Sequence, residues 1–178
     1  MTLLRASLTS VLSYYSGKSG TYCSVTPDIA FCEYLNKCSK VVDALGMKST
    51  SALNHHVTLV HSKNTISKPS HHEIWSKGFH GSTTFKASHT GFTHWAGHDD
   101  TGYVVLTLSS PTLSDFNRQL VNEYGLAGSF PDYTPHITVA TDVYGKATYA
   151  EDLILALNEI PRPPNLTLSG MKFEDLKD

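Results

Sequence analysis

The sequence reads HHVTLV at residues 55–60 and PHITVA at residues 135–140. Each stretch contains histidine, an apolar residue, threonine and two further apolar residues, in that order. We expect strands at 55–61 and 134–140, because polar and apolar residues alternate there and successive side chains of a strand point to opposite faces. The histidine and threonine of each stretch are two residues apart, so they should share a face.

On the first strand, His56, Thr58 and Val60 are expected on one face, and Val57, Leu59 and His61 on the other. On the second strand, His136 and Thr138 share a face. The residues between them, Ile137 and Val139, should point with Val57 and Leu59 into a core. If the two strands lie side by side, two imidazoles and two threonine hydroxyls meet across one groove.

The rest of the chain predicts a mixture of strands and helices. Further strands are expected at 20–26, 83–95, 103–108 and 165–173, and helices at 28–45, 114–124 and 151–160. Asp28 and Ser114 are the expected N-caps, and Pro111 is expected to end the preceding strand. Neighbouring strands with hairpin-like connections predict an α+β fold with a mostly antiparallel sheet.

Length and composition narrow the class of protein. With 178 residues, a single domain over 1–178 is expected, and 1–19 reads as an N-terminal leader segment. Apolar residues make up 40% and the net charge is −2, which argues against disorder and against a strongly basic surface for long nucleic acid. No apolar run approaches the roughly 18 residues that a membrane span requires. Three cysteines without paired spacing favour a reducing, cytoplasmic setting.

The paired motifs suit acid–base chemistry on a phosphate. An imidazole can accept or donate a proton near neutral pH, and a threonine hydroxyl can donate a hydrogen bond to a phosphate oxygen. One histidine would activate the nucleophile and the other would protonate the leaving oxygen. This scheme needs no cofactor and no metal, and which histidine plays which part stays open.

These motifs resemble the signature of the two-histidine phosphoesterase superfamily. The resemblance covers about residues 20–176 and implies two pseudo-symmetric lobes, each with flanking helices, and a cleft between them. Within the superfamily the chain is most similar to the bacteriophage anti-CBASS nucleases. The stretches that carry this similarity are GTYCSV at 20–25, YVVLTL at 103–108, SDFNRQLVNEYG at 114–125 and NLTLSGMKFEDL at 165–176.

The resemblance implies a metal-independent phosphodiesterase. Its substrate would be a cyclic dinucleotide or trinucleotide signal of bacterial antiviral defence, cleaved at 3′–5′ bonds in the host cytoplasm. The implied catalytic residues are His56, Thr58, His136 and Thr138. Tyr22, Tyr133 and Glu174 become candidate substrate contacts. Tyr133 either lines the mouth of the cleft or packs beside Pro135.

Two departures leave the substrate open. No aromatic residue follows Glu174 before the end of the sequence, and the histidine-rich region 63–98 is longer than the resemblance implies. That region reads as a solvated loop rather than a metal site, because its spacings match no zinc pattern. Trp75 and Trp95 could stack on bases or simply pack.

Two other functions remain. The first is an RNA 2′,3′-cyclic phosphodiesterase or 2′–5′ RNA ligase-like enzyme, which the near-neutral charge and only three arginines disfavour. The second is a non-catalytic protein that sequesters a cyclic nucleotide. The sequence does not indicate the oligomeric state.

Overall fold

Both His-x-Thr stretches form strands, β3 (Val57–Ser62) and β6 (His136–Thr141). β6 begins at its histidine, whereas β3 begins one residue after His56. The computed structural model describes residues 20–50, 54–65, 84–97, 102–126, 128, 132–141 and 147–176. The leader expected at 1–19 and most of the histidine-rich loop lie outside these residues.

The remaining elements follow the expected order. The other strands are β1 (Thr21–Pro27), β2 (Lys48–Ser49), β4 (Phe85–Ala96), β5 (Gly102–Ser109) and β7 (Leu166–Asp175). The helices are α2 (Ile29–Ala44), α4 (Pro111–Tyr124) and α5 (Ala147–Asn158). Only β2 was not expected, because two residues are too few to show a strand pattern. It exists through its pairing with β6.

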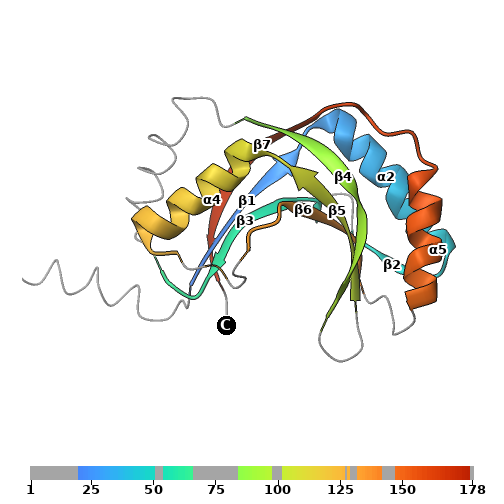
Figure 1. The fold of residues 1–178 in the computed structure, drawn as a ribbon, viewed down its shortest axis with the longest axis horizontal. Coiled ribbons are helices and arrows are strands. Elements are labelled where there is room, and N and C mark those ends of the chain that lie inside the picture. Colours follow the sequence, from blue (N-terminus) through green and yellow to red (C-terminus); the bar gives the residue numbers. More distant parts are fainter. Residues whose placement is uncertain are drawn as a thin grey trace, which may run out of the picture.

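The described strands form one seven-stranded sheet in the order β2-β6-β5-β4-β7-β1-β3, and every pairing among them is antiparallel. The α+β class and the antiparallel sheet are therefore confirmed. Four strands separate β3 from β6 in this order. The sheet nevertheless curves into an arch with the helices on its convex side (Figure 1), and β3 and β6 contact each other.

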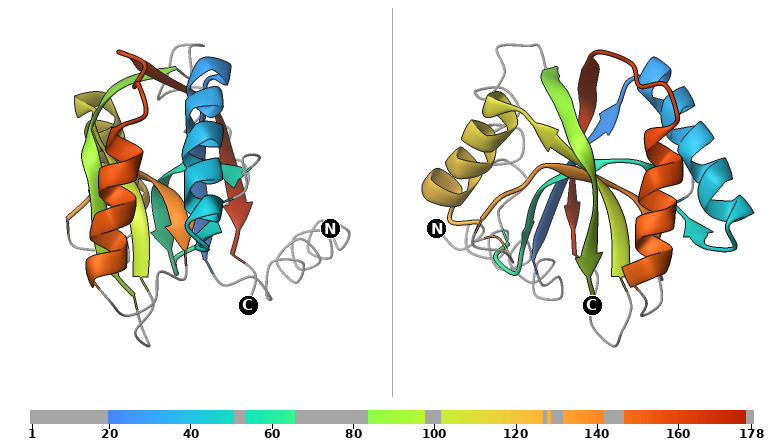
Figure 2. Two further views of the ribbon diagram at one scale, coloured as in Figure 1. Left: turned by 90° about the vertical axis from the view of Figure 1, so that its right-hand side faces the viewer. Right: turned by 45° about the vertical axis from the view of Figure 1, so that its right-hand side comes forward.

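The long strand β4 joins the two halves of the sheet. Its first residues, Phe85–Ala87, pair with β7, and the rest of the strand pairs with β5. The helices cross between the halves. α4 follows β5 but packs on β3, while α2 follows β1 but packs on β2 and β6. Figure 2 shows α2 and α5 side by side on the outer face, where they also contact each other.

Burial on the motif strands confirms the expected core face. The four intervening residues, Val57, Leu59, Ile137 and Val139, are fully buried. The histidines and threonines of both motifs are only half-buried. Burying one such aliphatic side chain contributes about 1.5–3 kcal/mol, so the apolar residues hold the strands while the polar residues remain accessible.

A β-bulge changes the expected faces at the end of β3. Ser24 of β1 pairs with Thr58, but Cys23 pairs with Val60, so Leu59 has no opposite residue. One extra residue reverses the alternation beyond it. Val60 is therefore in the core and His61 is exposed, the reverse of the simple alternation expected from the sequence.

The start of α4 also differs from the expected one. The expected cap, Ser114, lies inside the helix, and Ser110 is the N-cap, accepting a hydrogen bond from Leu113 N. Pro111, expected to separate strand from helix, is the first helical residue. A proline is favourable there because the first helical N–H has no intrahelical acceptor. At the other end, Gly125 adopts the left-handed conformation (φ 66°) that terminates helices.

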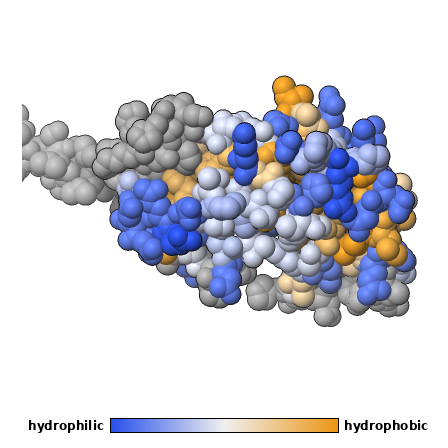
Figure 3. All heavy atoms as spheres, turned by 45° about the horizontal axis from the view of Figure 1, so that its top comes forward, coloured by the Kyte–Doolittle hydropathy of each residue, from blue (hydrophilic) through white to orange (hydrophobic). Residues whose placement is uncertain are grey.

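The outer surface carries both hydrophilic and apolar side chains. Figure 3 shows largely hydrophilic side chains with apolar ones gathered toward the end that carries α2 and α5, where Ile29 and Leu155 are exposed. Among the described residues, no helix is both long and apolar enough to cross a membrane.

The cap of α4 is testable by a pair of serine substitutions. Ser110→Ala should lower the free energy of unfolding by about 1 kcal/mol, because it removes the acceptor for Leu113 N. Ser114→Ala should leave stability unchanged within about 0.5 kcal/mol. Urea denaturation followed by circular dichroism measures both. Equal losses for the two variants would contradict this cap.

Candidate active site

Both motif histidines are held in the same way. The Nδ1 atom of His56 lies 2.6 Å from the carbonyl oxygen of Asn54, and that of His136 lies 2.8 Å from the carbonyl oxygen of Thr134. A carbonyl oxygen only accepts, so Nδ1 must carry the hydrogen in both rings. In the neutral ring, Nε2 is then the atom with a free lone pair. Each motif therefore presents the same basic nitrogen.

Thr58 is joined to the first strand of the sheet by Tyr22. The Tyr22 hydroxyl and Thr58 Oγ1 are 3.0 Å apart and hydrogen-bonded. The Tyr22 ring also meets the His56 ring edge to face, with centroids 5.9 Å apart. Burial raises the pKa of Tyr22, which keeps its hydroxyl protonated. Tyr22, His56 and Thr58 thus form one contact group at the start of β3.

The second motif has a tryptophan against its histidine. The Trp95 ring of β4 lies with its centroid 4.3 Å from that of His136, tilted by 59°. Burial lowers the pKa of His136 below the ordinary 6.5, the hydrogen bond to Thr134 O partly offsets this, and the positive charge of His56 lowers the pKa further. His136 is therefore neutral at pH 7, and it is near enough to His56 to respond to its charge.

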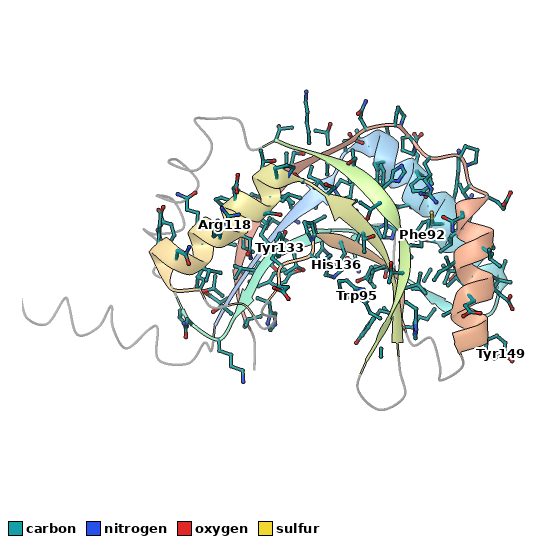
Figure 4. All side chains as sticks on the ribbon, viewed as in Figure 1. Phe92, Trp95, Arg118, Tyr133, His136 and Tyr149 are labelled. Atoms are coloured by element: carbon teal, nitrogen blue, oxygen red, sulfur yellow. The ribbon has the colours of Figure 1, made fainter. Side chains whose placement is uncertain are left out.

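A direct hydrogen bond spans the two motifs. Tyr133, three residues before His136, donates its hydroxyl hydrogen to the carbonyl oxygen of Thr58 over 3.1 Å. The Tyr133 ring packs against the core, and burial raises the pKa of its hydroxyl. Figure 4 shows His136 and Trp95 on the concave side of the arch, while Phe92 of β4 points toward the helices.

The pairing of β1 extends the polar face beyond the motifs. Glu174 and Lys172 of β7 are the register partners of Tyr22 and Ser24, so both share the face of Thr58. Both are exposed. The negative charge of Glu174 contributes to the raised pKa of Tyr22, which places the carboxylate near the hydroxyl.

The structure thus brings most of the expected site residues together. His56, Thr58, Tyr22 and Tyr133 are linked by direct contacts, and His136 lies across from them. Thr138 is two residues along β6 from His136, opposite Val105 of β5. Glu174 lies beside Tyr22 at the exposed rim.

Two residues near the site were not assigned to it from the sequence. The His61 ring lies 6.2 Å from that of Tyr22, because the bulge at Leu59 turns it to the motif face. Trp95, for which both stacking on a base and packing were open, lies against His136. The strand pattern alone carried no signal for either contact.

No cluster of three potential metal ligands occurs among the residues that the structure describes. Within that part of the chain, His89 hydrogen-bonds to Arg162 and lies outside the motif pair. The two imidazoles of the motifs can transfer protons beside the two threonine hydroxyl groups.

The family model described as anti-CBASS protein Acb1 matches residues 19–160. The chain is 28% identical over 131 residues to the anti-CBASS protein Acb1 of Vibrio phage KVP40, covering 74% of this chain and 78% of the relative. Among solved structures, Kluyveromyces marxianus Usb1 superposes with a TM-score of 0.55 at 12% identity, covering 90% of this chain and 95% of that one. E. coli LigT complexed with 3′-AMP superposes with a TM-score of 0.52 at 13% identity, covering 90% of this chain and 96% of that one.

The charge coupling between the two rings gives a measurable prediction. His136 should titrate below pH 6.5, followed by the ring resonances in NMR. His56→Gln removes a positive charge nearby, so it should raise the pKa of His136. The value should still remain below 6.5, because burial is the larger cause. A His136 pKa that does not respond to His56→Gln would contradict the proximity of the rings.

Proposed function

Because the chain belongs to the family of the anti-CBASS protein Acb1, we propose that it is a phosphodiesterase that cleaves 3′–5′ bonds of cyclic dinucleotide or trinucleotide messengers without a metal. This cleavage would remove the signal of the host CBASS antiviral system. The observation that carries the proposal is the matched pair of rings, His56 and His136. Each is held through Nδ1 so that Nε2 remains available to a substrate.

The reaction is an in-line displacement at phosphorus. A ribose 2′-hydroxyl or a water molecule loses its proton to one Nε2 and forms a new bond to phosphorus. The bond from phosphorus to the 5′ oxygen breaks, and the other ring, in its protonated form, donates a proton to that oxygen. The protons balance, since one ring gains what the other loses, and general acid–base catalysis of this kind contributes about 10²–10⁴-fold.

The structure favours His136 as the base. Its lowered pKa keeps the ring neutral at pH 7, so Nε2 has a free lone pair. His56 then serves as the acid that protonates the 5′ oxygen.

The threonines supply hydroxyl donors for the non-bridging phosphate oxygens. Thr58 follows His56 by two residues and Thr138 follows His136 by two. A phosphate between the two strands could therefore accept one hydrogen bond from each threonine. The bond from Tyr22 to Thr58 Oγ1 holds that hydroxyl in place. Donors held before the reaction stabilise developing charge at little reorganisation cost.

A small cyclic substrate agrees with the charge of the chain. With 14 basic and 16 acidic residues, the protein lacks the basic excess with which proteins bind long nucleic-acid backbones. On the first half of the sheet, Tyr22 and Glu174 are the proposed contacts to a base or a ribose of the substrate. Trp95 forms the opposite wall, beside His136.

Cleavage in the presence of EDTA tests the metal-free scheme. The purified protein should linearise cyclic dinucleotides or trinucleotides with and without EDTA, followed by chromatography. His56→Ala and His136→Ala should each lower kcat by about 10²–10⁴-fold. The matched control is His94→Ala, since His94 is on β4 but on the face opposite Trp95, and its activity should be unchanged. Complete loss of activity in EDTA would reject the scheme.

A substrate with sulfur in place of the bridging 5′ oxygen shows which histidine acts as the acid and which as the base. A thiolate leaves without being protonated, so the loss of the acid should matter little. The kcat of His56→Ala should return to within about tenfold of the wild type on this substrate, whereas His136→Ala should remain defective. The opposite pattern would reverse the two assignments.

The other two functions are distinguished in the same assays. Preferential turnover of 2′,3′-cyclic nucleotides would identify an RNA-end enzyme. A sequestering protein would bind cyclic dinucleotides in calorimetry without turnover, and the double variant His56→Ala, His136→Ala would still neutralise the signal. The proposed enzyme would lose that ability.

A further inference from the structure

Side chains from the second half of the chain hold the outer side of β3. β3 is the last strand of the described sheet, with β1 on its inner side. The Tyr133 hydroxyl donates to Thr58 O at 3.1 Å, and Asn117 Nδ2 of α4 donates to Leu59 O at 2.6 Å. Carbonyls of consecutive residues normally point to opposite sides of a strand. The bulge at Leu59 lets both accept donors from the second half.

These two contacts shorten the connection between the motifs. Within the described sheet, backbone hydrogen bonds connect β3 to β6 by way of β1, β7, β4 and β5. Small changes of twist at each of these pairings would add up across the arch. Tyr133 is three residues before His136, and its hydroxyl bonds to the first motif itself. The Tyr133 side chain therefore links directly two motif strands that are otherwise joined through four other strands of the sheet.

We propose that Tyr133, supported by Asn117, is a positioning residue that sets the separation of His56 and His136 across the substrate phosphate. This proposal rests on the proposed phosphodiesterase function. It differs from the expectation that Tyr133 contacts the substrate, because the Tyr133 hydroxyl is already bonded to Thr58 O and the ring packs against the core. A misplacement of about 1 Å between reacting groups can cost about 10²-fold in rate.

The kinetic test is Tyr133→Phe, which keeps the ring and removes only the hydroxyl. The kcat for the cyclic dinucleotide should fall about 10- to 100-fold, while KM should stay within about twofold, because alignment and not substrate binding is lost. Tyr149→Phe is the matched control, since Tyr149 is an exposed tyrosine on α5 and its loss of a hydroxyl should change neither value.

The second test needs no substrate. In the wild type, His56→Gln should raise the pKa of His136, as measured by NMR. In the Tyr133→Phe background, the same substitution should raise that pKa by less than half as much, because the two rings are no longer held at their original separation. In the Tyr149→Phe background, the full effect should remain.

The outcomes are separable. A raised KM with unchanged kcat would make Tyr133 a substrate contact, and a lower unfolding temperature with unchanged kcat would make it merely structural. Either result overturns the proposal.

If the wild type cleaves no cyclic nucleotide, the proposed function fails, and the NMR comparison alone decides the positioning role. If Tyr133→Phe does not fold, Asn117→Leu is the substitute variant, and its kcat should fall by a smaller factor. An unchanged kcat in Asn117→Leu would then overturn the proposal.

Discussion

The curvature of the sheet is the constraint on which this site depends. Hydrogen bonding alone leaves β3 and β6 separated by four strands, too far apart for their side chains to meet. The right-handed twist of adjacent strands accumulates over seven of them and closes the sheet into an arch. Apolar side chains such as Leu59 and Ile137 are buried in the core, and the polar residues that alternate with them remain partly exposed.

Local irregularities refine this arrangement. The bulge at Leu59 keeps Thr58 on the face of Tyr22 while it turns Val60 into the core and His61 outward. The helices crossing between the halves bring α4 against β3, and with it Asn117. Residues from the second half of the chain thus hold the first motif in place. The two motifs are linked directly, although each lies in its own half of the sheet.

The two histidines are equivalent in their hydrogen bonds but not in their surroundings. Each donates from Nδ1 to the backbone carbonyl oxygen two residues earlier. His136 has Trp95 against its ring and burial lowers its pKa, whereas the His56 ring meets Tyr22 edge to face. Two histidines with the same backbone hydrogen bond therefore lie in different environments, as the base and the acid of the proposed reaction would.

The sequence by itself determined the two motif strands, the faces of Val57, Leu59, Ile137 and Val139, the α+β class and the cap at Asp28. These features depend on neighbouring residues, so alternation and helix spacing reveal them. Tertiary structure alone decided the bulge, the contact of Trp95 with His136, the bond from Tyr133 to Thr58 and the short strand β2. Each of these joins residues far apart in the chain, and its energy arises only when the arch has brought them together.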